Sequence, residues 1–441
     1  MKLTVIGCGY LGATHAACMA ELGHDVLGLD TDQDKVALLN SGRAPFFERG
    51  VDALLAGHTA SGRLRFTASY AEAADFADLH FVGVGTPQRA GENAYDLTHL
   101  FAAVRQLAVS LRRPGVVAVK STVPVGTAPR VAEILRDFAP AGAGGRTEVA
   151  WNPEFLREGN AVDDTLRPDR IVLGFPAERS WAETLLRQCY AKIFEAGTPA
   201  IVTDWATAEL VKASANAFLA LKISFINAMA EVCEASGADV HQLADALGHD
   251  IRIGRAGLGP GLGFGGGCLP KDLRGFMARA GELGADRTVA LLGEADAINN
   301  SRRERMVDLV REQCEGTLAG RQITVWGAAF KPDTDDIRDS PALAVARRLH
   351  ELGATVTVTD PKSLDNARKL HPELTYVDDP VTAAEGADLL LHLTEWPEFG
   401  GIDPSGLRAR AGRPYVVDGR GTLDPARWRE AGWTFRSLGR F

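Results

Sequence analysis

The sequence is poor in cysteine and has no long apolar run. Its six cysteines are scattered, with no C-x-x-C pair and none of the spacings of a zinc site or a disulfide framework. No stretch reaches the roughly 18 uninterrupted apolar residues of a membrane span. The N-terminal MKLTVIGCGY lacks the basic and apolar segments of a signal peptide. We therefore expect a cytoplasmic protein with no metal site, no export and no membrane contact.

Positive charge is also scarce. The 48 lysines and arginines are outnumbered by 57 acidic residues, giving a formal net charge of −9, which argues against the basic face of a nucleic-acid-binding protein. The 441 residues are 46% hydrophobic and 24% charged, enough for two or three globular domains with separate cores.

The N-terminus has the pattern of a dinucleotide-binding unit. LTVI (residues 3–6) is typical of a buried strand, the turn G-x-G-x-x-G runs from Gly7 to Gly12, and a second strand at residues 25–29 ends at Asp30. In such a turn Gly9 lets the backbone approach a pyrophosphate, while the acid accepts hydrogen bonds from the ribose hydroxyls and repels a 2′-phosphate. The pattern predicts a Rossmann domain that binds NAD; glycines used only for turn geometry would leave Asp30 unexplained.

Two later apolar runs, at residues 79–85 and 116–120, end in hydroxyl residues followed by proline turns. Thr86 follows the first run and Thr122 the second. Because ligands bind outside the carboxyl ends of strands in an open α/β sheet, both threonines are candidates for the nicotinamide end of the cofactor. The alternative is that they only cap helices or form turns.

Residues 203–237 have apolar side chains at helical spacing and no proline, which predicts an unusually long helix. Such a helix could join two domains or pair with its copy in a dimer. Lys212 and Asn216 are four residues apart and so lie on one face. A solvated helix face is the alternative explanation for this pair.

The C-terminal region repeats the N-terminal pattern. QITVWG (residues 322–327) and ELGATVTVTD (residues 351–360) echo the first strand, turn and second strand, but GAAFKPDTDD replaces the glycine fingerprint. We expect this unit to bind something other than a whole second dinucleotide. Lys331 in the altered turn and Arg420 in the sequence DGR are suited to a diphosphate.

These patterns predict an α/β protein with two Rossmann-like doubly wound domains joined by a long central helix. We expect an N-terminal NAD-binding domain over residues 1–200, a central helical region suited to dimerisation over residues 201–305, and a C-terminal domain suited to a diphosphate over residues 306–441.

The stretch GFGGGCLPKD (residues 263–272) sets Cys268 behind four glycines. Glycines let backbone come close to a ligand or a neighbouring chain because they have no Cβ. A reactive thiol is one interpretation, and a flexible loop with a buried structural cysteine is the other.

Together the motifs resemble the UDP-glucose/GDP-mannose dehydrogenase family over nearly the whole chain. Besides the glycine turn, Asp30 and the central helix, the resemblance rests on VGTP, KSTVPVGT, NPEFLREG (residues 152–159), GFGGGCLPKD, AFKPDTDDIRDSPAL and DGR. RPDRIV (residues 167–172) is similar to the UDP-glucose branch rather than the GDP-mannose branch. The resemblance implies a four-electron oxidation of UDP-glucose to UDP-glucuronate, using two NAD in turn.

The resemblance also implies covalent chemistry at Cys268. A thiolate adding to the sugar aldehyde would give a thiohemiacetal, which the second oxidation turns into a thioester. Lys212 and Asn216 would stabilise the oxyanions. Glu154 is implied as the general base for thioester hydrolysis.

Further residues take roles from the same resemblance. Asp272 and a water held by Thr122 are implied in proton transfer. The implied cofactor-binding residues are Gly7, Gly9, Tyr10, Leu11, Gly12, Asp30, Lys35, Thr86, Thr122, Glu158, Lys271 and Arg338. The implied substrate-binding residues are Glu154, Phe155, Leu156, Lys212, Asn216, Arg252, Phe264, Gly265, Lys331 and Arg420. Arg252 matches an arginine that reaches the sugar from the partner subunit, which implies a homodimer or a higher even-numbered homo-oligomer.

The chain departs from the family pattern at a few positions. Gly257 stands where an aromatic residue usually touches the nucleotide sugar, Gly267 replaces a serine, and Leu221 and Ala230 replace more polar residues. The alternative substrate is therefore another UDP-hexose, such as a UDP-N-acetylhexosamine, oxidised to its uronate. A non-catalytic sugar-nucleotide-binding regulator would have lost the thiol, the lysine or the base, and all three are present.

Overall fold

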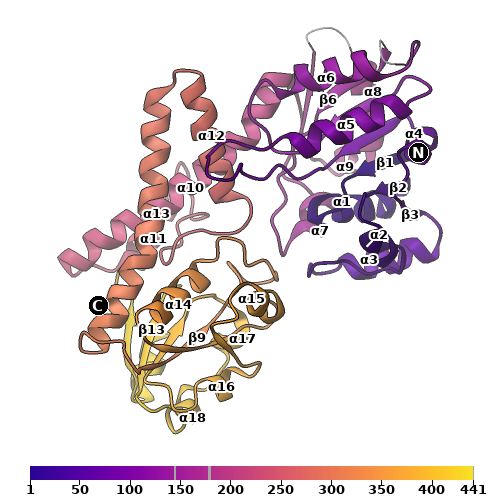
Figure 1. Ribbon diagram of the computed structural model, residues 1–441. Coiled ribbons are helices and arrows are strands. Elements are labelled where there is room, and N and C mark those ends of the chain that lie inside the picture. The colour runs from indigo at the N-terminus through magenta and orange to yellow at the C-terminus, as the bar shows by residue number, and fades with distance from the viewer. Residues whose placement is uncertain (144–145, 177–179, 441) are drawn as a thin grey trace. The chain divides into compact units, whose positions relative to one another are not determined.

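The computed structural model describes residues 1–143, 146–176 and 180–440 (Figure 1). It separates into two compact units, Met1–Ala215 and Asn216–Phe441, each with a sheet of its own. The 32-residue helix α10 (Trp205–Ser236) runs through the boundary and joins the two units. The expected helix over residues 203–237 is confirmed.

The first unit is built on an eight-stranded sheet with the order β3-β2-β1-β4-β5-β6-β7-β8. The first six strands pair in parallel, in the order of a dinucleotide-binding Rossmann fold, and β7 pairs with β6 in the antiparallel sense. The strands are β1 Lys2–Ile6, β2 Asp25–Leu29, β3 Leu64–Thr67, β4 Leu79–Val82, β5 Val116–Val119, β6 Glu148–Trp151, β7 Ile171–Phe175 and β8 Ala200–Asp204. The helices are α1 Tyr10–Glu21, α2 Gln33–Asn40, α3 Val51–Ala60, α4 Tyr70–Phe76, α5 Thr98–Ser110, α6 Thr127–Phe138, α7 Ala161–Leu166, α8 Trp181–Cys189 and α9 Ala191–Glu195.

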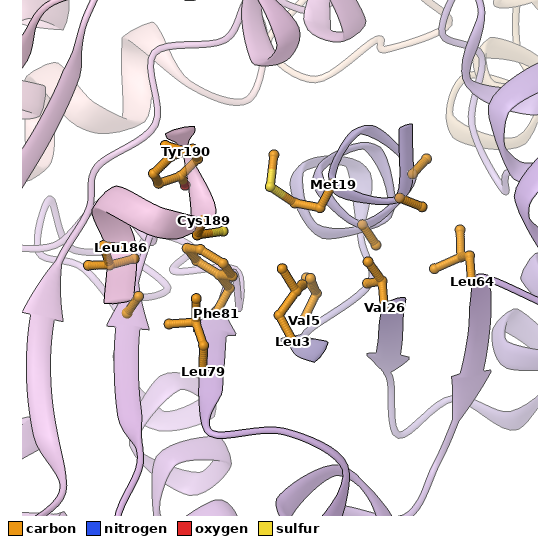
Figure 2. Packing of buried hydrophobic residues seen from close by; sticks show 14 of the residues in the cluster. Leu3, Val5, Met19, Val26, Leu64, Leu79, Phe81, Leu186, Cys189 and Tyr190 are labelled. Atoms are coloured by element: carbon orange, nitrogen blue, oxygen red, sulfur yellow. The ribbon is translucent and has the colours of Figure 1, made fainter. Parts of the chain in front are cut away.

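Apolar side chains fill both faces of this sheet. Every residue of β4 and β5 is buried, as expected for parallel strands covered by crossover helices on both sides. Figure 2 shows part of one core, where Met19 of α1 and Leu186 of α8 belong to the same cluster as Leu3 and Val5 of β1. This packing fixes the carboxyl ends of the strands, from which the functional loops start.

The second unit contains a six-stranded sheet with the order β11-β10-β9-β12-β13-β14, and all of its strand pairs are parallel. This order repeats that of β3-β2-β1-β4-β5-β6, so the expected second Rossmann-like domain is confirmed. The strands are β9 Gln322–Trp326, β10 Thr355–Thr359, β11 Thr375–Tyr376, β12 Leu389–His392, β13 Tyr415–Asp418 and β14 Thr434–Ser437. Its helices are α14 Pro341–Glu351, α15 Leu364–Leu370, α16 Pro380–Ala383, α17 Pro397–Gly400, α18 Pro404–Arg408 and α19 Pro425–Glu430.

Helices precede this second sheet along the chain. They are the second part of α10, then α11 (Val240–Gly248), α12 (Leu269–Glu282) and the 28-residue α13 (Asp286–Gln313). By length and composition α10 would suffice to cross a membrane, but core helices of water-soluble proteins meet the same criterion and 44% of its most apolar window is buried. The buried polar side chains of Glu209, Lys212, Asn216 and Asn227 lie along this helix.

Two strands, β4 and β5, are shorter than the apolar runs suggested. The runs at residues 79–85 and 116–120 give strands that end at Val82 and Val119. Beyond Val82 the chain enters the sequence GVGTP, where glycines and a proline favour loop backbone. The domain boundaries at residues 200 and 305 stay a prediction.

Candidate active site

The glycine turn between β1 and α1 has the shape that a dinucleotide requires. Gly7 has φ +86°, and a Cβ on Gly12 would lie 1.8 Å from the carbonyl oxygen of Gly7. A Cβ on Gly9, in contrast, would meet no atom within 4 Å, so the space beside Gly9 is open. The start of α1 has neither a side-chain cap nor an acidic residue. Its free amides are therefore available to a pyrophosphate.

Asp30 lies at the end of β2, beside this turn. Its buried carboxylate accepts hydrogen bonds from the amides of Cys8 (2.9 Å) and Asp32 (3.1 Å), and Lys35 Nζ lies 3.1 Å away. A groove of about 570 Å³ opens here and is lined by Gly7, Gly9, Asp30, Lys35, Tyr70 and Gly85, among others. Its size is in the range of small-molecule sites, and the residues present fit the adenosine end of NAD.

Thr86 and Thr122 lie together at the carboxyl ends of β4 and β5. The Thr86 hydroxyl donates to the Thr122 carbonyl (2.6 Å), and the Ser121 hydroxyl donates to the Val84 carbonyl (2.6 Å). These two bonds fix the loops of neighbouring strands against each other. The Thr86 hydroxyl thus has a structural partner, and its contact with the nicotinamide stays a prediction.

The NPEFLREG loop starts at the end of β6, where Asn152 is buried. Two residues on, Glu154 accepts a hydrogen bond from the amide of Leu156 (2.8 Å). The ammonium of Lys212, on α10, lies 3.1 Å from the other oxygen of Glu154, and it faces the ring of Phe155 at 5.7 Å. The structure thus brings together the residues expected to act as base and oxyanion stabiliser. Lys212 and Asn216 are both buried, so the solvated-face explanation is wrong.

In the second unit, the loop before α12 is closely packed, which explains its glycines. A Cβ on Gly263 would lie 2.2 Å from Asn299 Oδ1, one on Gly265 would lie 2.3 Å from the Asp339 carbonyl oxygen, and one on Gly266 would lie 2.8 Å from the Phe330 ring. Gly263 and Gly266 also have positive φ values. Only glycine fits these positions without displacing the neighbouring chain.

Cys268 comes at the end of this loop and is the N-cap residue of α12. It is exposed, whereas the other five cysteines are buried. The structure therefore rules out the interpretation of Cys268 as a buried structural cysteine. A helix N-terminus favours a thiolate electrostatically, which suits a nucleophile.

Asn216 and Asp272 lie in the same unit as Cys268. Asn216 Nδ2 donates to Asp272 Oδ2 (2.6 Å), and Lys271 Nζ lies 2.5 Å from the other oxygen of Asp272. The amide of Asp272 in turn donates to the carbonyl of Cys268 (2.8 Å). Asn216 follows Lys212 by four residues on α10, and the boundary between the two units lies between them.

The remaining substrate candidates lie at different places in the second unit. Phe264 is held by reciprocal hydrogen bonds with the Asn299 side chain. Lys331 lies in the turn after β9, with its ammonium 5.8 Å from the ring of Phe330. Arg252 lies on a loop where its side chain is 85% exposed and paired with Asp250. Arg338, a cofactor candidate, forms an ion pair with Asp336.

Within the described residues 216–440, the counterpart of the Asp30 site is occupied by protein groups. Asp360 occupies the place at the end of β10 that Asp30 occupies after β2, and it accepts hydrogen bonds from the amides of Ala328 (2.8 Å) and Ala329 (3.0 Å). The indole of Trp396 donates to the same carboxylate oxygen at 3.0 Å. The ribose-binding position is therefore filled by a protein side chain, in agreement with the loss of the glycine fingerprint.

Three family models match successive parts of the chain. The NAD binding domain of the UDP-glucose/GDP-mannose dehydrogenase family matches residues 1–194, its central domain matches residues 206–301, and its UDP binding domain matches residues 324–425. The chain belongs to the UDP-glucose/GDP-mannose dehydrogenase family. The expected family is thereby confirmed, together with NAD as the cofactor, dehydrogenation as the activity and a UDP-sugar as the class of substrate.

Individual members of this family are similar to this chain over their full length. A UDP-glucose 6-dehydrogenase of Rhizobium meliloti is 42% identical, with complete coverage of both chains. The structure of a UDP-glucose dehydrogenase from Pyrobaculum islandicum has a TM-score of 0.91 at 38% identity and covers 100% of this chain and 98% of that one. A UDP-D-ManNAc dehydrogenase from Pyrococcus horikoshii has a TM-score of 0.87 at 27% identity, with 100% and 99% coverage.

Two buried acids that sequence patterns do not predict hold loops of the first unit in place. Glu209 of α10 accepts from the amides of Gly126 (2.7 Å) and Ala128 (2.6 Å) at the start of α6. Glu48 accepts from the Tyr10 hydroxyl, the Gly159 amide (2.6 Å) and the Ala161 amide (2.9 Å). In the sequence, the only sign that Glu48 or Glu209 binds backbone amides is that each acid stands among a few apolar residues.

Glu48 also ties Tyr10 of the cofactor turn to the end of the NPEFLREG loop. Burial raises the pKa of the Tyr10 phenol far above its ordinary value, and the hydrogen bond to Glu48 and the charge of nearby Glu158 raise it further. The phenol therefore stays protonated and acts as a hydrogen-bond donor in this cluster.

A buried lysine was missed as well. Lys120, directly after β5, donates to Asn152 Oδ1 (3.0 Å), which also accepts from the Tyr190 hydroxyl (2.7 Å). Burial lowers the pKa of the Lys120 ammonium to about 8, and the negative charge of Glu154 opposes this effect. Lys120 thus fixes the first residue of the NPEFLREG loop.

Proposed function

We propose that this protein oxidises the C6 alcohol of UDP-glucose to the carboxylate of UDP-glucuronate, with consumption of two NAD. The observation that carries the proposal is the exposed thiol of Cys268, the N-cap residue of α12. The backbone carbonyl of Cys268 accepts a hydrogen bond from the amide of Asp272. A single alcohol oxidation needs no nucleophile, whereas further oxidation of the aldehyde does. NAD, when bound, accepts a hydride in each of the two oxidations.

The first task of the protein is to hold the cofactor. The turn from Gly7 to Gly12 and the free amides of α1 would hold the pyrophosphate, and Asp30 would hold the ribose hydroxyls. Thr86, Thr122 and Glu158 would lie toward the nicotinamide, with Lys271 and Arg338 completing the set of contacts. A proton leaves the C6 hydroxyl during the first oxidation, and Asp272 with a water held by Thr122 would accept it.

Cys268 would then add to the aldehyde. A C–S bond forms at C6 and the carbonyl oxygen becomes an oxyanion, which Lys212 and Asn216 would stabilise. The second oxidation gives a thioester. Glu154 would take a proton from water as the water attacks the thioester carbon, the C–S bond breaks, and the thiolate of Cys268 leaves.

The ion pair between Lys212 and Glu154 supports these roles. The two groups are nearly buried and 3.1 Å apart, so the group proposed as the base and the group proposed as the oxyanion donor lie next to each other. The same ammonium is a donor suited to an oxyanion at C6.

The UDP-sugar would be held mainly by the second unit. Lys331 would contact the diphosphate, with Phe264 and Gly265 along the sugar. Phe155 and Leu156 would supply backbone contacts to the hexose. We further propose that the protein works in the cytoplasm.

Arg252 would reach the site of a partner subunit in a homodimer. Two side chains at the tip of its loop are almost fully exposed, with Ile251 97% and Arg252 85% accessible. Phe218, Phe225 and Val232 of α10 are exposed as well. Apolar residues at helical spacing on a long helix are suited to pairing with a second copy.

A second candidate substrate is a UDP-N-acetylhexosamine. Gly257 has φ +81°, and a Cβ there would lie 3.5 Å from the Lys222 side chain, so this position does not supply the aromatic residue expected beside the sugar. The similarity to the UDP-D-ManNAc dehydrogenase of Pyrococcus horikoshii favours the same alternative.

An assay of NAD reduction over a panel of UDP-, GDP- and TDP-sugars separates the two candidates. We expect UDP-glucose to give the highest kcat/KM, with two NADH formed per sugar and UDP-glucuronate as the product. A single NADH with release of an aldehyde would rule out the thioester route. A higher kcat/KM with a UDP-N-acetylhexosamine than with UDP-glucose would identify the UDP-N-acetylhexosamine as the substrate.

A further inference from the structure

Asn299 lies on the long helix α13 and contacts the glycine loop that precedes Cys268. Its side chain is completely buried. Its Oδ1 accepts a hydrogen bond from the amide of Phe264 at 2.8 Å, and its Nδ2 donates to the carbonyl of the same residue at 3.0 Å. The side chain thus gives Phe264 the pair of hydrogen bonds that a residue of a neighbouring antiparallel strand would give.

Gly263 is the residue that allows Asn299 to come this close. A Cβ on Gly263 would lie 2.2 Å from Asn299 Oδ1, and Gly263 has φ +81°. Any other residue here would push the side chain of Asn299 away from Phe264. The glycine of the loop and the asparagine of α13 therefore depend on each other.

Two more buried side chains hold the start of the loop at Gly261. Asn227 Oδ1, on α10, accepts a hydrogen bond from the Gly261 amide at 2.9 Å, and Arg302 Nε, on α13, lies 3.3 Å from the Gly261 carbonyl oxygen. Arg302 comes three residues after Asn299, so the two side chains lie on the same face of α13. Side chains of two long helices thus fix this part of the loop.

Helix α13 also holds the helix that begins after Cys268. Arg274 of α12 donates to the carboxylate of Asp296 of α13 in two hydrogen bonds, at 3.1 Å and 3.2 Å. Asp296 comes three residues before Asn299, on the same face of α13. Cys268 is the N-cap residue of α12, so the chain on both sides of this cysteine is fastened to one helix.

Three glycines separate Phe264 from Cys268. Glycine backbone has more conformational freedom than that of any other residue. Within this segment the amide of Gly266 donates to the Arg338 carbonyl at 2.9 Å. Because the glycines have no side chains that could hold them, the position of the segment depends on hydrogen bonds to its backbone and to the backbone just before it.

We infer that Asn299 is a positioning residue for Cys268: its two hydrogen bonds to Phe264 fix the glycine loop and, through it, the place of the thiol at the start of α12. The consequence for catalysis rests on the proposed function, in which the second oxidation depends on the thiol and the first does not. The fixing of the loop and the reactivity of the thiol can be measured without any substrate.

The test uses the full-length protein with two variants of Asn299. Asn299→Leu has a similar shape and removes both hydrogen bonds, whereas Asn299→Asp keeps the acceptor for the Phe264 amide and removes the donor. Asn40→Leu is the matched control, because Asn40 forms the same reciprocal pair with Phe66 in the first unit. There Oδ1 accepts from the amide at 2.8 Å and Nδ2 donates to the carbonyl at 2.9 Å.

Three quantities are measured for each protein. Amide hydrogen exchange of residues 261–267 is followed by mass spectrometry without ligands. The rate of alkylation of Cys268 by iodoacetamide is followed by peptide mass under the same conditions. Semicarbazide, added during turnover of UDP-glucose and NAD, traps any aldehyde that is released as its semicarbazone.

We expect Asn299→Leu to speed exchange at residues 261–267 by about tenfold, the size expected for the loss of two neutral hydrogen bonds. Alkylation of Cys268 should slow by about twofold to fivefold, because the thiol is already exposed and loses only its fixed place at the helix N-terminus. Trapped aldehyde should appear, because the second oxidation slows more than the first. Asn299→Asp should give intermediate values, and Asn40→Leu should match the unaltered protein in all three measurements.

The inference is overturned if Asn299→Leu leaves exchange at residues 261–267 unchanged, if alkylation of Cys268 does not slow, or if UDP-glucose is oxidised with no trapped aldehyde. The same effects in Asn40→Leu would also overturn it, because they would report a general loss of stability. Should Asn299→Leu fail to fold, Asn299→Asp decides by the same measurements. If the unaltered protein forms no NADH from UDP-glucose, the proposed function fails, while exchange and alkylation still decide this inference.

Discussion

The ammonium of Lys212 lies 3.1 Å from the carboxylate of Glu154, and both side chains are nearly buried. The two residues are far apart in the sequence and come from different elements, the loop after β6 and helix α10. Glu209, three residues before Lys212 on α10, bonds to two amides at the start of α6. These bonds fix the rotation of the helix, so that Lys212 faces Glu154.

If Glu154 is the base for thioester hydrolysis, Glu154→Gln should block that step after both oxidations. The amide keeps the shape of the side chain but cannot accept a proton from water. We expect steady-state turnover to fall by about 10²-fold to 10⁴-fold. Intact-mass measurement after mixing with UDP-glucose and NAD should show the enzyme carrying a UDP-glucuronyl adduct. A variant with low turnover and no adduct would assign Glu154 to an earlier step.

Cys268→Ser should retain NAD and UDP binding and lose NADH production from UDP-glucose. The serine hydroxyl has a much higher pKa than a thiol and is a poor nucleophile near neutral pH. Cys314→Ala is the control, because Cys314 is a buried thiol of the same unit and should leave turnover close to that of the unaltered protein. Near-normal NADH production by Cys268→Ser would show that the thiol is not a nucleophile.

Asp30 should determine the choice between the two nicotinamide cofactors. Its carboxylate is held by two backbone amides, so it cannot turn away from a 2′-phosphate. We expect kcat/KM for NAD to exceed that for NADP by at least about 10²-fold, and Asp30→Ser to reduce this ratio. Asp32→Asn is the control, because Asp32 caps α2 next to Asp30 without lining the groove. An unchanged ratio in Asp30→Ser would place the ribose elsewhere.

Local patterns predicted the strands, the glycine turn and α10, because they depend on periodicity and on residues close in sequence. The strand order of the second sheet could be expected from its repeat of the first pattern. Glu48 and Glu209, in contrast, bind amides at residues far from them in the chain. Arg420 was expected at the diphosphate or the sugar from its chemical type and from the DGR motif, and its three carbonyl acceptors are likewise contacts with distant parts of the chain. Long-range contacts of this kind leave no local pattern.

Lys120 should make the stability of the first unit depend on pH. Its pKa is lowered from 10.5 to about 8 by burial, so between these values the unfolded chain binds more protons than the folded one. Stability must then rise with pH over this range. Relative to Lys120→Met, the unaltered protein should gain about 2 kcal/mol in free energy of unfolding between pH 7 and pH 9.5.

Urea titration with limited proteolysis, scored on peptides of residues 1–215, measures this difference. Lys192→Met removes an exposed lysine of the same unit and serves as the control. A constant difference between the unaltered protein and Lys120→Met from pH 7 to pH 9.5 would mean that Lys120 does not titrate in this range.

Arg252 should act in the site of a partner subunit. Lys222 of α10 holds the Arg252 loop in shape by donating to the carbonyls of Ile253 (2.9 Å), Gly254 (3.2 Å) and Ala256 (2.6 Å). The exposed arginine is thus presented on a rigid loop, beside the nearly fully exposed Ile251. A rigid loop that exposes a charged and an apolar side chain at its tip is suited to a contact with a second copy of the chain.

Arg252→Ala and Cys268→Ala subunits should each be nearly inactive alone and regain activity when mixed under conditions that allow exchange. A mixed dimer contains one site in which the Cys268 of one subunit meets the Arg252 of the other. Random mixing in equal amounts gives half mixed dimers with half of their sites intact, so we expect about a quarter of the activity of the unaltered protein. Subunit exchange is followed separately by native mass spectrometry of tagged chains. Complete exchange without recovered activity would place Arg252 in the site of its own subunit, and recovery would show that one subunit completes the site of the other.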